Sequence, residues 1–145
     1  MDYKTRAAEV KADSFKMAAL PREIRDRALE AIISELSSHK EEIFAANAKD
    51  LKKAAEENLP LPIQNRLKFD DHKLSDCISG MKDLISMEDP LFRELLKRDL
   101  DDGLTLIKTT CPIGVIGVIF ESRPDALVQI SALCVKSGNC SVLKG

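Results

Sequence analysis

Four cysteines and two histidines are the side chains of this sequence best suited to nucleophilic or metal-binding chemistry. They are Cys77, Cys111, Cys134, Cys140, His39 and His72. No two cysteines have the CxxC spacing of a metal or redox pair, and no histidine stands at ligand spacing from one. Cys134 and Cys140 fall in segments expected to be core, and no cation or helix start is placed to make Cys111 a thiolate. We therefore interpret the cysteines as small apolar residues and the histidines as surface residues, and we expect no metal site.

A charged turn, Glu121-Ser122-Arg123-Pro124, has residue types that suit ligand binding. It follows the apolar run 115–120, whose β-branched residues predict a strand buried on both faces. Pro124 suits the first turn of a helix, with Ser122 as a possible cap. The free amides of a helix start favour anions, and Arg123 could add a bidentate donor. The alternative is that Glu121 and Arg123 pair with each other or with a neighbour.

The residues after this turn predict a helix to about Ser137 and then a second strand at 140–144. The helix is apolar nearly all round and ends at Gly138-Asn139, two residue types that readily adopt the left-handed conformation. Strand, helix and strand within about 30 residues form a right-handed βαβ crossover, which pairs the strands in parallel. Ligands of such sheets bind beyond the carboxyl ends of the strands, which places Lys144 at the same edge as the turn. Lys144 is then either a point charge for a ligand or a solvated strand end.

A glycine-rich dinucleotide loop is not present. Gly114 and Gly117 precede or lie inside the first strand, and the following turn, "ESRPD", contains no glycine. The ordinary fingerprint needs glycines after the strand, where the backbone approaches the pyrophosphate. A dinucleotide that binds here must be held in another way.

The first part of the chain is helical in pattern. Apolar residues recur every three to four positions over 21–38, 40–57 and 71–87, which predicts amphipathic helices with a shared core. The predicted stripe of 40–57 consists of Phe44, Ala48, Leu51 and Ala55. The prolines of "NLPLP" (58–62) break the second of these helices. We place the helical layer at about residues 3–88.

A β-hairpin is predicted at about 95–110. Residues 91–100 fit a helix or a strand, but Asp102-Gly103 precedes the alternating segment 104–110. Asp-Gly is typical of a type I′ turn, because glycine readily takes positive φ. We expect arms at 95–100 and 104–110.

The composition excludes several classes of protein. The net charge is −2, charged residues make up 32% and aromatic residues 4% of the chain, and there is no tryptophan. Such a surface offers no basic face or stacking platform for nucleic acid. There is no apolar run of about 20 residues and no signal-peptide core, so we expect a cytoplasmic protein without a membrane span.

The predicted fold class is α/β, and it is incomplete. A parallel sheet needs helices on both faces and several strands, whereas only one βαβ unit, at about 113–145, is present. We therefore expect the chain to be part of a larger protein.

Several blocks of the sequence, in order, resemble the γ-glutamyl phosphate reductase family, also called glutamate-5-semialdehyde dehydrogenases. The blocks are "ANAKDL" (46–51), "LPLPIQNRLKF" (59–69), "DGLTLIKTTCPIGV" (102–115) and "PIGVIGVIFESRPDALVQISALCVKSGNCSVLKG" (112–145). The family belongs to the aldehyde dehydrogenase superfamily, whose cofactor domain lacks the glycine-rich loop. The resemblance implies that residues 1–145 are the N-terminal part of the cofactor-binding domain. It also implies that the hairpin is an oligomerisation ribbon in a homo-oligomer.

The resemblance further implies the chemistry. A cysteine thiolate attacks L-glutamyl 5-phosphate and expels phosphate, and NADPH then delivers hydride to the thioester to give L-glutamate 5-semialdehyde. Lys144 matches the superfamily lysine that contacts the cofactor ribose, and Glu121, Ser122, Arg123 and Pro124 are the other expected cofactor-binding residues. Ser122 falls near the superfamily's oxyanion-hole asparagine, a departure that weakens its assignment.

The nucleophile of the family lies far beyond the matched segment, and none of the four cysteines aligns with it. We therefore expect the chain alone to be inactive. Two alternatives remain open at this point. The chain could belong to the reductase half of a bifunctional proline-biosynthesis synthetase, or it could be a non-catalytic, truncated oligomerisation module whose strand edge pairs with a partner.

Overall fold

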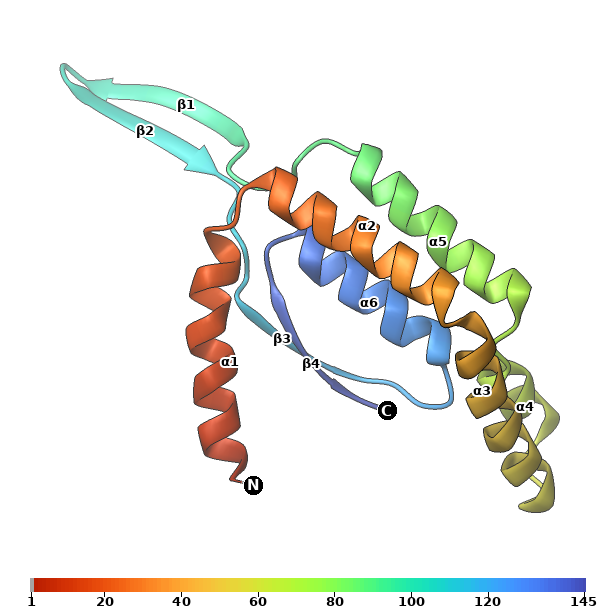
Figure 1. Cartoon of the computed structure of the whole chain (residues 1–145). Helices are drawn as coiled ribbons and strands as arrows, with labels where there is room; N and C mark the ends of the chain where they lie inside the picture. The colour runs from red at the N-terminus through yellow and green to blue at the C-terminus, as the bar shows by residue number, and fades with distance from the viewer. Residues whose placement is uncertain (1) are drawn as a thin grey trace.

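A computed structural model describes residues 2–145 (Figure 1). The helices are α1 (Tyr3–Ala18), α2 (Arg22–Ser38), α3 (Lys40–Glu56), α4 (Leu61–Leu67), α5 (Asp71–Ser86) and α6 (Pro124–Lys136). The strands are β1 (Glu94–Asp101), β2 (Leu104–Thr109), β3 (Val115–Ile119) and β4 (Cys140–Lys144). The predicted α/β class, with a helical layer, a hairpin and one βαβ unit, is confirmed.

The βαβ unit consists of β3, α6 and β4. The two strands pair in parallel, with Val115 opposite Cys140 and Ile119 opposite Lys144. Helix α6 packs on β4, α1 contacts both strands, and the strands run between these two helices (Figure 1). Two strands leave much apolar surface uncovered: Ile119 is 84% exposed and Ile113 is 79% exposed.

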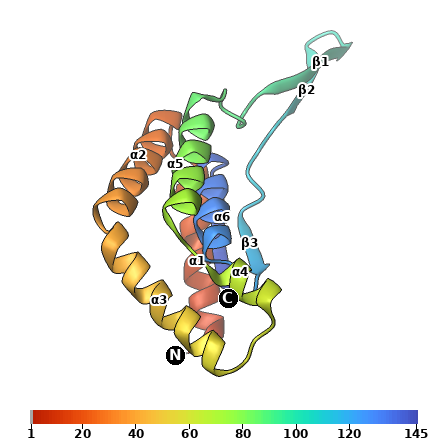
Figure 2. The ribbon, with the colours of Figure 1, turned by 90° about the vertical axis from the view of Figure 1, so that its right-hand side faces the viewer.

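The helical layer packs α2 and α5 against the side of α6 that faces away from the strands (Figure 2). Its centre is formed by Leu29, Met81 and Ala132, which are at most 2% exposed, with Ile32, Ile33 and Ile85 packed around them. A second cluster joins Phe69, Leu74 and Cys77. The predicted apolar stripes of α2 and α5 therefore form the core. The stripe predicted for α3 was partly wrong, since Ala48 and Ala55 are exposed while Asn47 and Ala54 are buried.

Helix α4 was not predicted. Helix α3 ends before "NLPLP", as expected, but a seven-residue helix begins at Leu61 with Pro62 in its first turn. Proline is tolerated there because the first amides of a helix have no internal partner. Asn47 fixes this segment: its Nδ2 donates to the Leu67 carbonyl at 2.9 Å, and its Oδ1 accepts from the Phe69 amide at 2.8 Å.

The hairpin of β1 and β2 is antiparallel and projects away from the helices (Figures 1 and 2). The ambiguous segment 91–100 is a strand from Glu94 onward. The predicted turn type was wrong: a type I′ turn needs positive φ at both central residues, whereas Gly103 (φ +75°) has it and Asp102 does not. The ladder contains two register irregularities, one of them beside this turn. Such irregularities bend a strand and let a hairpin close without a type I′ turn.

Candidate functional site

The predicted site lies at the carboxyl ends of β3 and β4. Lys144 is opposite Ile119 in the parallel ladder, and the Phe120 amide donates to the Lys144 carbonyl at 2.9 Å. The turn 121–124 follows directly after Phe120. The sheet therefore brings Lys144 and the charged turn to one edge, where ligands of open α/β sheets bind.

The turn has an unusual backbone at Ser122, whose φ is +54°. Left-handed φ is uncommon for a residue with a Cβ and costs on the order of 1 kcal/mol. The expectation that Ser122 caps α6 was wrong. Arg123 occupies the capping position and no side chain bonds the first amides, because Ser122 lies one residue too far upstream.

Asp125 is a site residue that the sequence analysis missed. Its side chain is 14% exposed and lies between two cations, with Lys73 Nζ at 3.7 Å from Oδ1 and Arg123 Nη2 at 3.7 Å from Oδ2. Oδ1 is buried without a hydrogen-bond partner within residues 2–145. Arg123 thus pairs with Asp125 rather than with Glu121. An acidic residue directly after a proline that opens a helix was the signal that could have identified it.

Asp125 also changes what the start of α6 can bind. A carboxylate in the first helical turn is stabilised by the helix dipole and offsets its positive end. The start of α6 is therefore less favourable for an anion than the sequence indicated. Lys144 and Glu121 are both exposed, and within residues 2–145 neither forms an ion pair. Of the two cations at this edge, Arg123 pairs with Asp125, and Lys144 has no ion-pair partner among residues 2–145.

A groove lies next to the turn. It has a volume of about 360 Å³ and runs between α3 and α6. Phe120, Pro124 and Leu127 line it from the side of the turn, and Asn47 and Asp50 line it from α3. The groove is mainly apolar, with polar groups from α3 at its wall.

All four cysteines have free thiols, and they differ in exposure. Cys77 and Cys134 are buried, Cys140 is half-buried and Cys111 is exposed. Burial raises the pKa of the Cys77 thiol, and the nearby Asp125 carboxylate raises it further. Burial likewise raises the pKa of Cys134. These two thiols therefore lack the lowered pKa of a nucleophile and act as apolar core residues.

Further features bear on the range of functions. Both histidines are exposed, and each lies near a carboxylate one helical turn away: His39 near Glu35, and His72 near Asp76. In the described residues, no three potential metal ligands lie together. Nor does any helix of this part of the chain have the length and apolar character to cross a membrane.

Comparisons with known proteins identify close relatives. The chain is 54% identical over all 145 residues to "Gamma-glutamyl phosphate reductase" of Pelotomaculum thermopropionicum and covers 33% of that protein. It is 51% identical over 145 residues to the protein of the same name from Acetivibrio thermocellus, covering 34% of it. The chain thus spans about a third of the length of the curated relatives it matches. A scan against protein-family models found no match.

Solved structures of the same enzyme share the fold. The crystal structure of gamma-glutamyl phosphate reductase from Saccharomyces cerevisiae matches with a TM-score of 0.94 at 37% identity, over 100% of this chain and 37% of that one. The structure from Thermotoga maritima matches with a TM-score of 0.91 at 29% identity, over 96% of this chain and 34% of that one. The similarity in sequence and in fold extends over essentially the whole chain.

Proposed function

Because the chain belongs to the γ-glutamyl phosphate reductase family, we propose that it forms part of a cytoplasmic reductase of proline biosynthesis. The whole enzyme reduces L-glutamyl 5-phosphate to L-glutamate 5-semialdehyde and releases phosphate. The observation that carries this proposal is the match of all 145 residues to reductases of that name. On this reading, residues 1–145 are the N-terminal part of the cofactor-binding domain.

NADPH is the proposed reductant, and it supplies the hydride when bound. Lys144 is the best-placed residue to hold it, since its ammonium is exposed and free at the carboxyl edge of the sheet. Such a point charge suits a ribose hydroxyl or a 2′-phosphate. The start of α6 suits a pyrophosphate less well, because Asp125 already offsets its positive end. The wall beside the cofactor is then formed by Glu121, Ser122, Arg123 and Pro124.

In this proposal the nucleophilic cysteine lies outside these 145 residues, because none of the four cysteines matches the nucleophile of the family that the chain resembles. Cys77 and Cys134 are buried with raised pKa values, which is the opposite of what a nucleophile needs. Within the chain, the Ser122 hydroxyl is a weak candidate for a donor at the edge of the oxyanion site. The left-handed backbone of Ser122 supports a constrained role, since strain of this kind clusters at functional sites.

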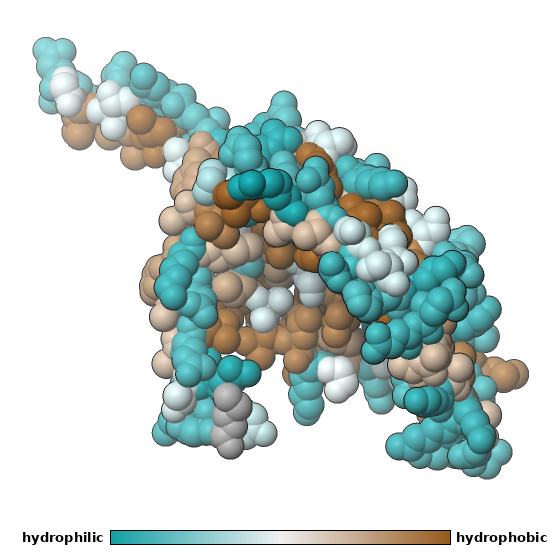
Figure 3. Space-filling view, in the orientation of Figure 1, coloured by the Kyte–Doolittle hydropathy of each residue, from teal (hydrophilic) through white to brown (hydrophobic). Residues whose placement is uncertain are grey.

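The hairpin is the proposed surface for homo-oligomer assembly. Every residue of β1 and β2 is exposed, including six large apolar side chains, and hydrophobic side chains are visible along the projecting hairpin (Figure 3). These are Leu95, Leu96, Leu100, Leu104, Leu106 and Ile107. A two-stranded ribbon with apolar side chains is marginally stable by itself, and its edges have unpaired backbone groups. A second copy of the enzyme is the proposed partner for this surface.

A grafted enzyme tests the proposed function. It consists of residues 1–145 followed by the remaining C-terminal residues of the Pelotomaculum thermopropionicum relative. We expect it to oxidise L-glutamate 5-semialdehyde with NADP⁺ and phosphate, the reverse reaction, at a rate within about tenfold of the intact relative, a barrier difference of about 1.4 kcal/mol. The 145-residue chain alone should show no activity.

The controls separate the alternatives. A grafted enzyme that folds and assembles like the intact relative but has no activity would contradict the proposal and favour a non-catalytic oligomerisation module. Activity of the grafted enzyme is compatible with a free-standing reductase and with the reductase half of a bifunctional synthetase. A kinase sequence upstream in the reading frame would identify the latter.

A further inference from the structure

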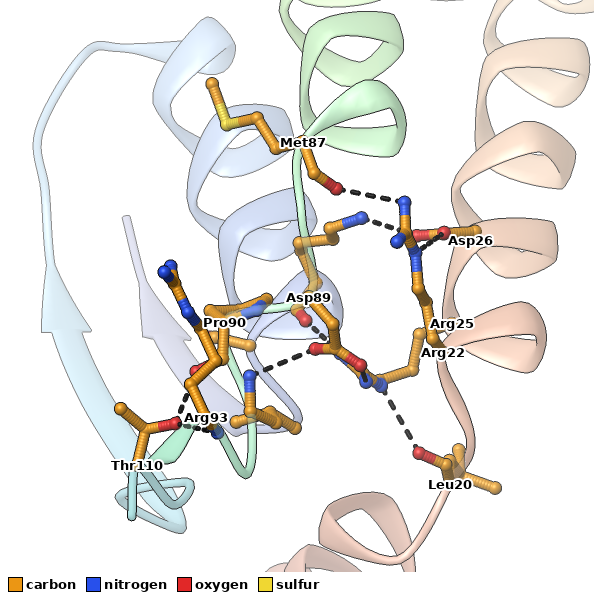
Figure 4. A network of polar contacts seen from close by, with 12 residues as sticks. Leu20, Arg22, Arg25, Asp26, Met87, Asp89, Pro90, Arg93 and Thr110 are labelled. Carbon is orange, nitrogen blue, oxygen red and sulfur yellow. Dashed lines mark hydrogen bonds and ion pairs between the residues drawn. The ribbon is translucent and has the colours of Figure 1, made fainter. Parts of the chain in front are cut away.

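A cluster of buried and half-buried charged residues lies at the base of the hairpin (Figure 4). It joins the start of α2, the ends of α5 and α6, and the segment that leads into β1. Its members are Arg22, Arg25, Asp26, Asp89 and Lys136. Arg25 and Lys136 are only 2% and 3% exposed, which is rare for charged residues unless they are fully paired.

Arg25 is the centre of the cluster. Its Nη2 donates to Asp89 Oδ2 at 2.5 Å and its Nε to the Leu20 carbonyl at 3.3 Å, while Nη1 donates to the Lys136 carbonyl. The planar guanidinium therefore binds three separate segments at fixed angles. A buried cation has a large desolvation penalty, which complete pairing of this kind offsets.

Asp89 connects the helices to the hairpin. One of its oxygens binds Arg25, and the other accepts a hydrogen bond from the Leu91 amide at 3.0 Å. Burial raises the pKa of Asp89, but the hydrogen bonds from Arg25 and Leu91 outweigh this, so that the pKa lies below its ordinary value. A single ionised carboxylate thus joins α2 to the chain that enters β1.

The second carboxylate of the cluster, Asp26, binds two cations. Lys136 Nζ donates to Asp26 Oδ1 at 2.8 Å and to the Ile85 carbonyl at 3.3 Å, and Arg22 Nε donates to Asp26 Oδ2 at 3.0 Å. Arg22 Nη2 also donates to the carbonyls of Ile85 and Met87 at the end of α5. Three cations thus face two carboxylates, and the surplus positive charge meets the negative ends of the α5 and α6 dipoles.

The neck of the hairpin consists of two legs, residues 90–93 and 110–112, and contacts hold both of them in place. Thr110 Oγ1 donates to the Pro90 carbonyl at 2.7 Å and accepts from the Arg93 amide at 2.9 Å. Both legs also pack closely against the turn after α6. A Cβ added at Gly138 would lie 2.7 Å from Leu91 Cδ1 and 3.2 Å from Pro112 Cγ. The neck therefore has contacts with the ion cluster on one side and with Gly138 on the other.

Beyond the neck, the strands project from the body of the molecule (Figures 1 and 2). The eight residues of β1 extend about 25 Å at ~3.3 Å per residue. A rotation of about 10° at the neck would move the far end of such a strand by about 4 Å, more than a hydrogen bond tolerates. The direction of the hairpin must therefore be determined at its base.

We propose that Arg25 and Asp89 are positioning residues that fix the direction of the hairpin relative to the β3–β4 sheet. The ionic contact holds the Leu91 leg against α2, and the Gly138 turn holds both legs from the other side. This role of Arg25 and Asp89 at the neck does not depend on catalysis. Its consequence for assembly rests on the proposed role of the hairpin in a homo-oligomer.

Amide hydrogen exchange of the 145-residue chain and of the grafted enzyme tests this inference. In Asp89→Asn, an amide side chain replaces the carboxylate that binds Arg25. We expect the amides of Leu91, Phe92 and Thr110 to exchange at least about tenfold faster, which reports local opening, while those in the middle of α5 stay protected. The control, Asp83→Asn, makes the same chemical change at an exposed position of α5, where the side chain has no ion pair within residues 2–145, and should alter nothing.

Asp89→Glu keeps the charge in case Asp89→Asn unfolds the chain. Its longer side chain can still pair with Arg25 but displaces the bond to the Leu91 amide, so the neck alone should exchange faster. Two outcomes would overturn the proposal. The first is an unchanged exchange rate at the neck in Asp89→Glu. The second is that, in both variants, the exchange rate rises equally in the neck and in α2, α5 and α6. Sedimentation of the grafted enzyme is a separate readout. A loosened neck with unchanged assembly would contradict only the proposed role of the hairpin.

Discussion

Asn139 Oδ1 accepts a hydrogen bond from the Gly114 amide at 2.8 Å, which ties the turn after α6 to the start of β3. The Asn139 side chain is buried, and its Nδ2 donates to the Ser137 carbonyl at 3.1 Å and to Ser137 Oγ at 2.9 Å. The Cys140 amide completes the junction by donating to the Gly114 carbonyl at 2.9 Å. One amide side chain thus closes the crossover and sets the register of the parallel pair.

Asn139→Ala should destabilise the chain because it leaves the half-buried Gly114 amide without its side-chain acceptor. A buried unsatisfied donor costs about 1–3 kcal/mol in the free energy of unfolding. Urea unfolding followed by circular dichroism measures this change. Asn65→Ala, at an exposed position of α4, is the control and should change stability by less than about 0.5 kcal/mol. Equal effects of the two substitutions would contradict the role of Asn139.

Two glycines should respond to alanine with opposite signs. Gly138 has φ +66°, and a Cβ there would lie 2.7 Å from Leu91 Cδ1, so Gly138→Ala should cost about 1–3 kcal/mol. Gly80 is in α5 with no atom within 4 Å of an added Cβ, so Gly80→Ala should stabilise by about 0.5–1 kcal/mol. Thermal unfolding of both variants checks the pair. If Gly138→Ala leaves the free energy of unfolding unchanged, Leu91 and the hairpin neck do not pack closely against this turn.

The stability of the chain should fall in acid through Asp26 and Asp89. Burial raises the pKa of each, but hydrogen bonds from Lys136 and Arg22 to Asp26, and from Arg25 and the Leu91 amide to Asp89, leave both pKa values below normal. The unfolded chain, with a carboxyl pKa of about 3.9, then binds more protons than the folded chain in the acid range. The stabilisation is therefore complete above about pH 5 and is lost as pH falls through the folded pKa values.

Urea unfolding of the unmodified chain and of Asp89→Asn between pH 2 and 7 measures this dependence. The difference in stability between them should be largest near neutral pH and shrink in acid. A difference that is constant with pH would show that Asp89 stabilises the fold without its charge.

Asp70 caps α5 and should titrate far below an ordinary aspartate. A hydrogen bond from Lys68 and another from the Lys73 amide lower the pKa of Asp70 to about 2. Lys68 Nζ lies 2.8 Å from Asp70 Oδ2. Lys68→Met should raise this pKa toward the normal value, which carbon-detected NMR titration of the carboxyl group can follow. If the pKa does not move, the Lys73 amide alone sets it.

The main elements were predictable because local patterns determine them. The stripes of α2 and α5 and the apolar run of β3 each indicated an element that the structure contains. The rule that ligands bind at the carboxyl ends of strands also placed Lys144 beside the turn 121–124. The signal for each element lies within the segment itself, and the position of Lys144 follows from the parallel pairing that a βαβ unit imposes.

What was missed depends on neighbours distant in sequence. Arg25 lies on an amphipathic helix whose charged residues suggest a solvated face, and Lys136 is the last residue of α6. Both are buried only because the end of α5 and the segment with Asp89 pack over them. Asp125 lies beside Lys73 of α5, a contact that no pattern within α6 indicates. The left-handed backbone conformation of Ser122 is likewise set by where β3 ends and α6 starts. A serine in the sequence does not predict this conformation.

Lys144→Met should weaken cofactor binding in the grafted enzyme without slowing the chemical step. If Lys144 donates one charge-assisted hydrogen bond to the cofactor ribose or its 2′-phosphate, the loss of about 1.5–3 kcal/mol should raise the KM for NADP⁺ at least about tenfold. The value of kcat should change little, because the bond is the same in the ground and transition states. Steady-state kinetics in the direction of semialdehyde oxidation provides both numbers. Lys82→Met, at an exposed position of α5 away from this edge and from the hairpin, is the matched control and should leave both unchanged. A fall in kcat with an unchanged KM would remove Lys144 from the proposed cofactor site and assign it to the reacting centre.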